Sequence, residues 1–277
     1  VGVYGGAITI TGQAGSNGFS VGNYNLSYVA GDLVVNPRAV TLTALPQERT
    51  YGDAMALDET AFTVTDLDGD SALPNGEVID TVALIGATGV DIITTNNVGT
   101  YADEIAITAQ SGSNGFSVSN YELSYVAGDL VVNPRSVTLT ALLQEGIYGD
   151  TMVLDETAFT VTDLDGDSVL PNGEVVDTVA LNSVTGVDVT TRSNVGTYAD
   201  EIAITDQAGS NGFDAGNYDL TYVTGNLVVN QRSVTLTALQ QERGYGTSLT
   251  FDSEAFTVLD MDGDNALPNG ELIETVD

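Results

Sequence analysis

Hydrophobic and polar residues alternate along several short stretches of this chain. From Ser136 the letters SVTLTA place every second residue in an apolar position, and EIAIT from Glu104 does the same. A period of two is typical of a β-strand with one face buried and the other in solvent. Turn-forming residues, above all glycine, separate these stretches. The pattern predicts a chain built mainly of short strands.

A hairpin is expected in the stretch NYELSYVAGDLVV. Alternate residues from Tyr121 to Tyr125 share one face, and Gly128 allows the chain to bend back into the apolar stretch 130–132. The one candidate for a helix is a single turn around Leu57–Phe62. We therefore expect a mainly all-β fold, either a β-sandwich or a β-grasp-like sheet, with at most one short helical turn in each repeating module.

The chain repeats itself with a period of 97 residues. LVVNPR begins at Leu33 and again at Leu130, and LVVNQR begins at Leu227. A unit of this length is too long for one turn of a solenoid and suits a small domain. The segment is expected to be a window from a longer array. The predicted parts are the C-terminal part of a module (1–38), two complete modules (39–135 and 136–232) and the N-terminal part of a module (233–277).

The junctions between modules are short and contain no Gly/Ser-rich linker, so the random-coil behaviour of flexible linkers does not apply. Pro37 and Pro134 each remove a backbone donor and restrict φ, although Gln231 takes this place at the third junction. An arginine follows in every case, and we expect it to pair with acids across the junction. The sequence predicts a semi-rigid rod of modules. These junction arginines are Arg38, Arg135 and Arg232.

Charge and composition exclude several functions. The chain carries 39 Asp and Glu against 6 Arg, a formal net charge of −33, and has no Lys, His, Cys or Trp. Without His or Cys it lacks the usual general base, thiolate nucleophile and zinc ligands. Nucleic-acid binding is disfavoured because it needs a basic surface. No run approaches the ~18 apolar residues of a membrane helix, so no membrane insertion is expected. The acidic surface favours hard cations.

Three motifs span essentially the whole module: YGD after the first strand, NVGTYADEIAI in the middle and NYELSYVAGDLVVNP at the end. Together they resemble the MBG-type repeat module, in its YGX variety, of bacterial surface proteins. The resemblance implies tandem arrays in long exported adhesins or extracellular matrix proteins, a β-rich fold and no catalysis. It also implies an extracellular, cell-surface location. Thr247 departs from the aspartate of YGD, and the DLDGD loop lies outside the family pattern.

The DLDGDSALPNGE loop carries four carboxylates at positions 1, 3, 5 and 12, counted from its first aspartate. This is the ligand spacing of an EF-hand loop, and Ca²⁺ takes six to eight oxygen ligands. The sequence predicts a calcium site in each copy. Its ligands are Asp66, Asp68, Asp70 and Glu77; Asp163, Asp165, Asp167 and Glu174; and Asp260, Asp262, Asp264 and Glu271.

The alternative to a calcium site is a solvated acidic connection between strands. Ser71 stands where an EF-hand has its turn glycine, Pro74 occupies position 9, and the flanks read as strands rather than helices. Two carboxylates ~4 Å apart repel by about 4 kcal/mol at an effective dielectric near 20, so a folded turn needs a cation whereas a splayed one does not.

The acid pairs Asp103–Glu104 and Asp200–Glu201 suggest a second alternative, a glycoside hydrolase with two catalytic carboxylates. Neighbours in a strand face opposite ways, so we expect solvated edge charges instead and no enzyme activity. Our leading hypothesis is a calcium-stiffened stalk in an extracellular adhesin or biofilm-matrix fibre, whose partners are neighbouring modules. The alternatives are a glycan- or surface-polymer-binding module acting by multivalency, and a filament or surface-layer subunit that self-associates laterally or head to tail.

Overall fold

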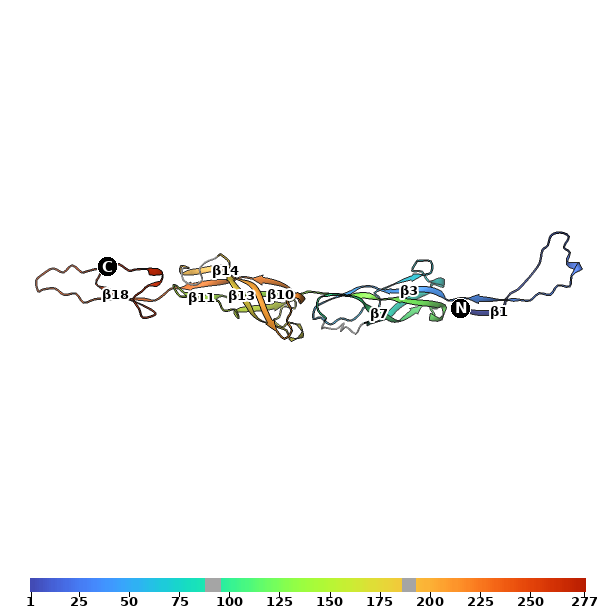
Figure 1. Ribbon diagram of the computed structural model, residues 1–277, viewed down its shortest axis with the longest axis horizontal. Helices are drawn as coiled ribbons and strands as arrows, with labels where there is room; N and C mark the ends of the chain where they lie inside the picture. The colour runs from blue at the N-terminus through green and yellow to red at the C-terminus, as the bar shows by residue number, and fades with distance from the viewer. Residues whose placement is uncertain (88–95, 186–192) are drawn as a thin grey trace. The chain divides into compact units, whose positions relative to one another are not determined.

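The computed structural model describes residues 1–87, 96–185 and 193–277 (Figure 1). The chain divides into two compact units, residues 1–133 and 134–277. Each unit holds one complete set of strands and part of a second set. In the described ranges, no helix is long and apolar enough to cross a membrane.

Two facing sheets form the complete module of the first unit. One sheet has the order β5-β3-β8 and the other the order β4-β9-β7-β6, so the all-β expectation is confirmed. The strands are β3 (Arg38–Ala44), β4 (Gln47–Thr50), β5 (Phe62–Asp66), β6 (Val78–Gly86), β7 (Gly99–Ser113), β8 (Tyr121–Val126) and β9 (Gly128–Asn133).

The second unit repeats this arrangement with the orders β12-β10-β15 and β11-β16-β14-β13. Leu139, Ile202 and Leu227 are fully buried between its sheets, as Leu42, Ile105 and Leu130 are one period earlier. The strands are β10 (Arg135–Ala141), β11 (Gln144–Ile147), β12 (Phe159–Asp163), β13 (Val175–Ser183), β14 (Gly196–Ser210), β15 (Tyr218–Val223) and β16 (Gly225–Asn230).

Parallel ladders join the first half of each module to its last strands. In the first unit β3 pairs with β8, and β4 pairs with β9, both in parallel. In β3 every second residue is buried, as the alternating pattern predicts, and Leu42 is fully enclosed. Parallel neighbours need a long crossover, here most of the module, so these contacts are among the most non-local in the fold.

The predicted hairpin between residues 121–126 and 130–132 is wrong. β8 pairs with β3 in one sheet, whereas β9 pairs with β7 and β4 in the other. The chain crosses between sheets at Gly128, where an added Cβ would lie 2.7 Å from the carbonyl oxygen of Ala44. This glycine is therefore required for close backbone approach rather than for a hairpin bend.

In the residues that the structure describes, helical structure is limited to three-residue 3₁₀ turns, and none of them lies at Leu57–Phe62. That stretch holds a hydrogen-bonded turn in which the Ala61 amide donates to the Asp58 carbonyl at 3.0 Å. The 3₁₀ turns are η1 (Val21–Asn23), η2 (Pro74–Gly76), η3 (Val118–Asn120), η4 (Pro171–Gly173), η5 (Ala215–Asn217) and η6 (Pro268–Gly270).

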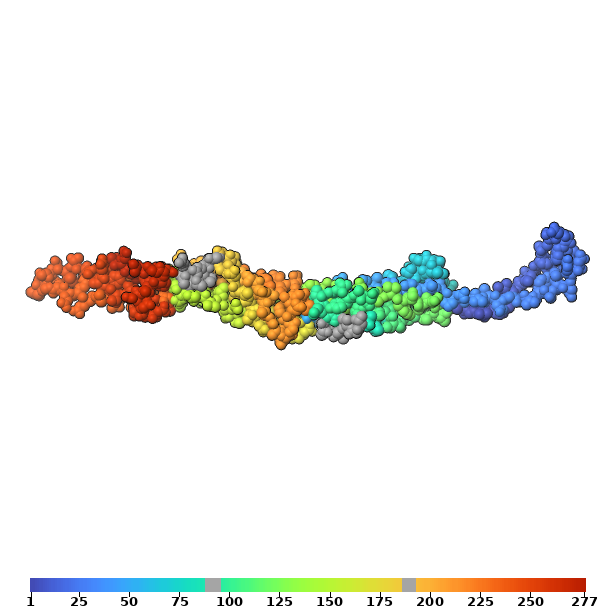
Figure 2. All heavy atoms as spheres, in the orientation of Figure 1, coloured from blue at the N-terminus to red at the C-terminus, as the bar shows by residue number. Residues whose placement is uncertain are grey.

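The partial modules at the two ends of the chain form only two-stranded ladders. β1 (Gly2–Ile8) pairs with β2 (Gly31–Val35), and β17 (Val234–Ala238) pairs with β18 (Phe256–Asp260). In Figure 2 the atoms of residues 1–38, in the darkest blue, form a thin strip, whereas those of the following module fill a solid body. These ends have no second sheet to bury their apolar faces.

Candidate functional site: the acidic loop and its arginine

The acidic loop begins where the edge strand β5 ends, at Asp66. The Asp66 amide donates to the Asp70 carbonyl at 2.8 Å, and the Gly69 amide donates back to the Asp66 carbonyl at 3.0 Å. Gly69 has φ +85°, a left-handed conformation that favours glycine. Local backbone bonds thus close DLDGD into a tight turn between β5 and η2.

The aspartates of this turn accept hydrogen bonds from the turn's own backbone. Asp66 Oδ1 accepts from the amide of Asp68 at 2.8 Å, and Asp70 Oδ1 accepts from the amide of Ala72 at 3.0 Å. Aspartate commonly stabilises a turn by bonding to an amide two residues further along the chain. The alternating spacing therefore places each of these acceptors next to a backbone donor.

A junction arginine supplies the positive charge in the loop. Arg38 Nε and Nη2 donate to Asp66 Oδ2 at 2.9 and 2.5 Å, and Nη2 also donates to Asp68 Oδ2. The hydrogen bonds from Arg38 are the main reason that the pKa of Asp66 lies below its ordinary value. The same contacts raise the pKa of Arg38. The guanidinium thus stabilises the ionised form of a carboxylate whose side chain is almost wholly enclosed.

The second and third copies repeat this geometry. Arg135 Nε lies 2.9 Å from Asp163 Oδ2, and Arg232 Nε lies 2.7 Å from Asp260 Oδ2. Burial raises the pKa of both aspartates, but the arginine and backbone hydrogen bonds outweigh it and the net shift is downward. The remaining loop acids behave as in the first copy. Asp165 and Asp262 pair with the same arginines, while Asp167 and Asp264 accept from the amides of Val169 and Ala266.

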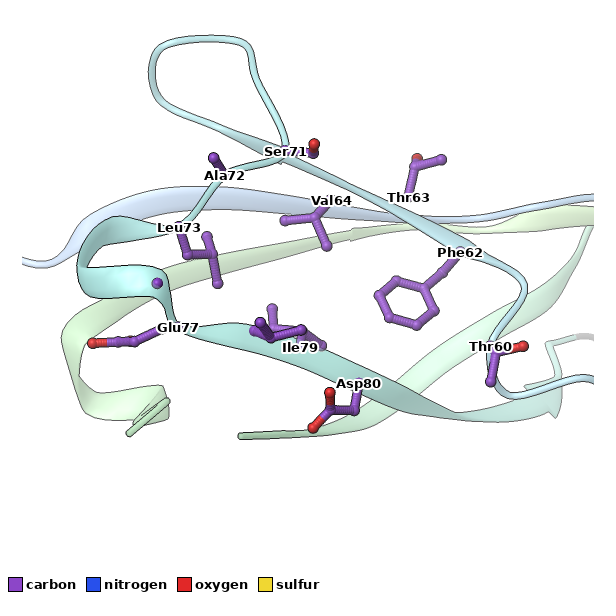
Figure 3. A pocket seen from close by; sticks show the side chains of 12 residues that line it. Thr60, Phe62, Thr63, Val64, Ser71, Ala72, Leu73, Glu77, Ile79 and Asp80 are labelled. Atoms are coloured by element: carbon purple, nitrogen blue, oxygen red, sulfur yellow. The ribbon is translucent and has the colours of Figure 1, made fainter. Parts of the chain in front are cut away.

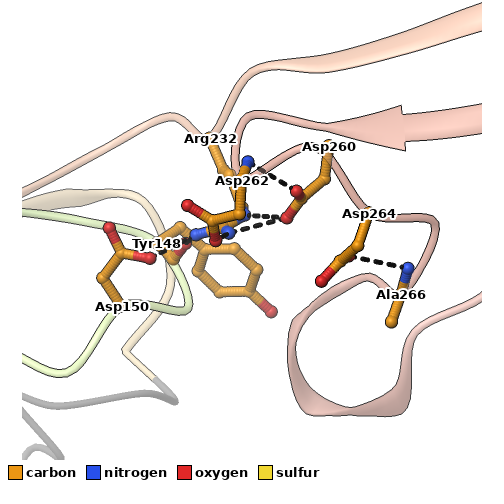
Figure 4. Close-up of polar contacts among 7 residues, drawn as sticks. All are labelled: Tyr148, Asp150, Arg232, Asp260, Asp262, Asp264 and Ala266. Carbon is orange, nitrogen blue, oxygen red and sulfur yellow. Dashed lines mark hydrogen bonds and ion pairs between the residues drawn. The ribbon is translucent and has the colours of Figure 1, made fainter.

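Arg232 has a further partner that joins two modules. Its Nη1 pairs with Asp150 Oδ1, while Nη2 pairs with Asp260 and Asp262 (Figure 4). Asp150 belongs to module 136–232, and Asp260 and Asp262 belong to the part that follows it. The Arg232 side chain is 6% exposed, against 29% for Arg38, which pairs with Asp66 and Asp68. The expected pairing of the junction arginines with acids is confirmed for all three arginines, and Arg232 adds an acid of the module that it ends.

The glutamate at position 12 of the spacing lies apart from the aspartates and accepts from a tyrosine. The Tyr121 hydroxyl donates to Glu77 Oε2 at 2.6 Å, and Tyr218 donates to Glu174 in the same way. Burial, together with the hydrogen bond to Glu77, raises the pKa of Tyr121 to about 12. Glu271 instead accepts from Tyr148. Sequence spacing alone gave no sign of these tyrosine partners.

The residues as arranged do not fit a calcium site. Within the described parts of the chain, no group of three or more carboxylates, His or Cys is placed to hold a metal ion. Asp66 and Asp68 are bound to Arg38, and Glu77 is bound to Tyr121. A six- to eight-oxygen shell would require the arginine to leave. Calcium binding by these loops stays a prediction from the sequence.

Sequence reasoning missed two buried carboxylates. Glu104 and Glu201 are 1% and 2% exposed, although both were expected to be solvated edge charges. Asp103 and Asp200 have φ values of +55° and +56°, at bulges that interrupt the strand alternation. A non-glycine residue with positive φ cannot be read from the sequence, and the bulge turns the next side chain inward.

Glu201 is held by hydroxyl groups in the second unit. It accepts hydrogen bonds from the side chains of Ser183 and Thr185, the latter at 2.8 Å. Burial raises the pKa of Glu201, and the hydrogen bonds from these two residues outweigh it, so the pKa is lowered. The arrangement satisfies a buried charge and has the character of a structural contact.

An apolar hollow lies between the edge strands β5 and β6, separate from the arginine contacts. It has a volume of about 740 Å³, and its counterpart between β12 and β13 has about 570 Å³. In Figure 3 the side chains of Phe62, Val64, Leu73 and Ile79 point into it, whereas Thr63 points away. This hollow is thus a recurrent apolar feature at the open side of each complete sandwich.

Comparison with known proteins agrees with the repeated architecture. A family profile described as "MBG domain (YGX type)" matches residues 40–131 and again residues 137–228. Each match begins within the first strand of one complete module and ends within its last strand. No curated protein matches the chain.

Proposed function

Because the chain belongs to the MBG domain (YGX type) family, we propose that it is a spacer segment of an extracellular bacterial surface protein, such as an adhesin or a biofilm-matrix fibre. In this proposal tandem β modules hold a functional end of the protein away from the cell. The modules themselves carry out no catalysis. Their task is to resist bending and unfolding.

The contact of Arg232 with both modules is the observation that carries this proposal. Its guanidinium bonds to Asp150 in the module that it ends and to Asp260 in the part that follows. Only residues 231–233 separate β16 from β17. A short connection with ion pairs across it restricts bending more than a flexible linker does.

The charge of the chain also supports an extended spacer. A formal net charge of −33 makes neighbouring chains repel one another and favours separated, soluble modules. Each loop arginine offsets this repulsion locally, where the acids are most crowded. Charge repulsion therefore keeps the acidic surfaces apart, while the arginine–aspartate pairs still hold the junction together.

Single-molecule stretching tests the spacer function. The chain has no cysteine, so cysteines introduced at its two ends give defined attachment points. We expect two equal unfolding events, one for each complete module, with contour-length gains of roughly 300 Å because an extended residue spans at most ~3.3–3.6 Å. Unfolding in one step, or without a measurable force, would contradict the proposal.

Calcium stiffening is a separate prediction with its own test. If the loops bind calcium, the thermal midpoint of the chain rises in calcium relative to chelator, by mass action on the folded state. Arg38→Gln should increase this response, because removing the guanidinium frees Asp66 and Asp68 as ligands. Identical midpoints in calcium and chelator for both proteins would reject calcium binding and leave the spacer proposal standing.

A further inference from the structure

The Tyr-Gly-Asp segment at residues 148–150 forms a rigid turn at the end of its module. The Tyr148 amide donates to the carbonyl of Asn230, the last residue of β16, at 2.9 Å. The Asp150 amide donates to the Ile147 carbonyl at 3.0 Å. These bonds fix the turn against the strand that leads into the next module.

The side chain of Tyr148 reaches the following module. Its hydroxyl donates to the carboxylate of Glu271, and the side-chain amide of Asn269 lies 3.4 Å from the same hydroxyl oxygen. Both partners belong to the Pro-Asn-Gly-Glu turn that contains η6. The hydrogen bond to Glu271 is the main reason that the pKa of Tyr148 is raised.

A glycine is required at position 149 both by its positive φ and by its close contact with the following module. It has φ +86°, which disfavours other residues. A Cβ built on it would also overlap side-chain atoms of Pro268, the first residue of the same Pro-Asn-Gly-Glu turn. Gly246, the equivalent glycine one period later, has φ +84° but no atom within 4 Å of its Cβ position. The two glycines therefore share a backbone requirement and differ in their neighbours.

Asp150, the last residue of the segment, contributes an ion pair. It pairs with Arg232 Nη1, and the same nitrogen lies 3.5 Å from the carbonyl oxygen of Tyr148 (Figure 4). The guanidinium is thus held by the Tyr-Gly-Asp segment on one side and by Asp260 and Asp262 on the other. All three residues of the motif take part in contacts that cross the junction.

We infer that the Tyr-Gly-Asp segment is a docking surface whose partner is the Pro-Asn-Gly-Glu turn of the following module. The tyrosine binds the glutamate of that turn, the glycine admits its proline, and the aspartate orients the arginine shared with the acidic loop. The inference rests on the proposed spacer function, because docking between consecutive modules has a role only in an array. In the third copy Thr247 stands in place of the aspartate. The equivalent surface of that copy therefore lacks this carboxylate.

Pulsed electron paramagnetic resonance on the full chain tests this inference. Nitroxide labels on cysteines introduced at the exposed positions Asp219 and Thr257 report the distance across the junction, and no native cysteine competes for the label. We expect one narrow distance distribution for the parent chain. Gly149→Ala and Tyr148→Phe should each broaden it. Asp150→Thr, which copies the third module, should broaden it less.

Gly246→Ala is the matched control, since it has the same backbone penalty without the proline contact, and it should leave the distribution narrow. A second label pair at Asp177 and Asp219 checks that module 136–232 stays folded. If Gly149→Ala changes the distance distribution of this second label pair, the docking surface is judged from Tyr148→Phe instead. Distributions as narrow in Gly149→Ala and Tyr148→Phe as in the parent, or a parent as broad as these variants, would overturn the docking surface. The stretching experiment reports on the spacer function independently.

Discussion

Residues 1–38 and residues 98–135 have closely similar sequences but different structures. Both stretches contain a stacked Phe–Tyr pair with ring centroids 5.4 Å apart, Phe19–Tyr24 and Phe116–Tyr121. Both also form a 3₁₀ turn just before the tyrosine. Yet residues 121–126 form β8, whereas the equivalent residues 24–29 form no strand. The two stretches share these local contacts, yet the strand forms in the second stretch and not in the first.

The difference follows from the partner strands. β8 pairs in parallel with β3, and β9 pairs with both β4 and β7, whereas among the described residues β2 pairs only with β1. Leu130 is fully buried, and Leu33 in the same local sequence is 44% exposed. Strand propensity by itself is therefore insufficient here, and burial between two sheets decides the structure. The first half of a module is what orders its last strands.

The largest effect should come from a cavity in the core of the complete module, made at Leu130 and compared with the same substitution at Leu33. Leu130→Ala should cost about 2–5 kcal/mol of module stability, because it leaves a cavity between the sheets. Leu33→Ala, in the same GDLVVNPR context, should change stability by no more than about 0.5 kcal/mol. Hydrogen exchange followed by mass spectrometry, read on peptides from residues 39–133, measures both. Equal losses would show that the comparison is wrong.

A smaller effect should follow from the tyrosine hydroxyl. Tyr121→Phe leaves the buried Glu77 without its donor and should cost about 1–3 kcal/mol, whereas Tyr24→Phe should cost nothing measurable. Because the pKa of Tyr121 is raised to about 12, its contribution is full below the ordinary value of 10 and is lost as the pH rises through 12. Alkaline unfolding of the parent, compared with Tyr121→Phe, checks this. A steeper alkaline loss in the variant would contradict it.

The smallest expected effect is a loss of stability at acid pH that is confined to modules with an acidic loop. The pKa of Asp66 is lowered from its ordinary value of 3.8, so the unfolded chain takes up its proton first as the pH falls. The stabilisation is present above pH 3.8 and is lost below it. Asp66→Asn should flatten this part of the pH profile for residues 39–133, as followed by hydrogen exchange. An unchanged slope would mean that the Arg38 contact adds nothing to stability.

The position of the acidic loop could be predicted from the sequence, but its arginine partner could not. The alternating aspartates, Gly69 and the 97-residue period are all readable, and they marked the loop in every copy. The partner of Asp66 is Arg38, 28 residues earlier in the chain. A spacing within one loop carries no information about a cation that arrives from elsewhere. The EF-hand spacing therefore led to the calcium prediction, and it gave no sign that a guanidinium binds the first two aspartates.

The burial of Glu104 is a second feature that could not be predicted from the local sequence. Its neighbours alternate as a strand, so the pattern predicted an exposed charge. A bulge at Asp103 shifts the register by two residues and turns Glu104 inward. Such a bulge depends on pairing with β9, which local sequence does not encode.

The sequence alone determined the β class, the period and the Asp-Gly and Asn-Gly turns, since each depends on residues close together in the chain. Period-two alternation requires only neighbouring side chains, and Asp-Gly and Asn-Gly turns require only local φ and ψ values. The tertiary structure decided which sheet each strand joins, which carboxylates are buried and which residue neutralises them. Those outcomes depend on partners tens of residues away, such as β3 for β8 and Arg232 for Asp150, and they are set by which surfaces are removed from water together.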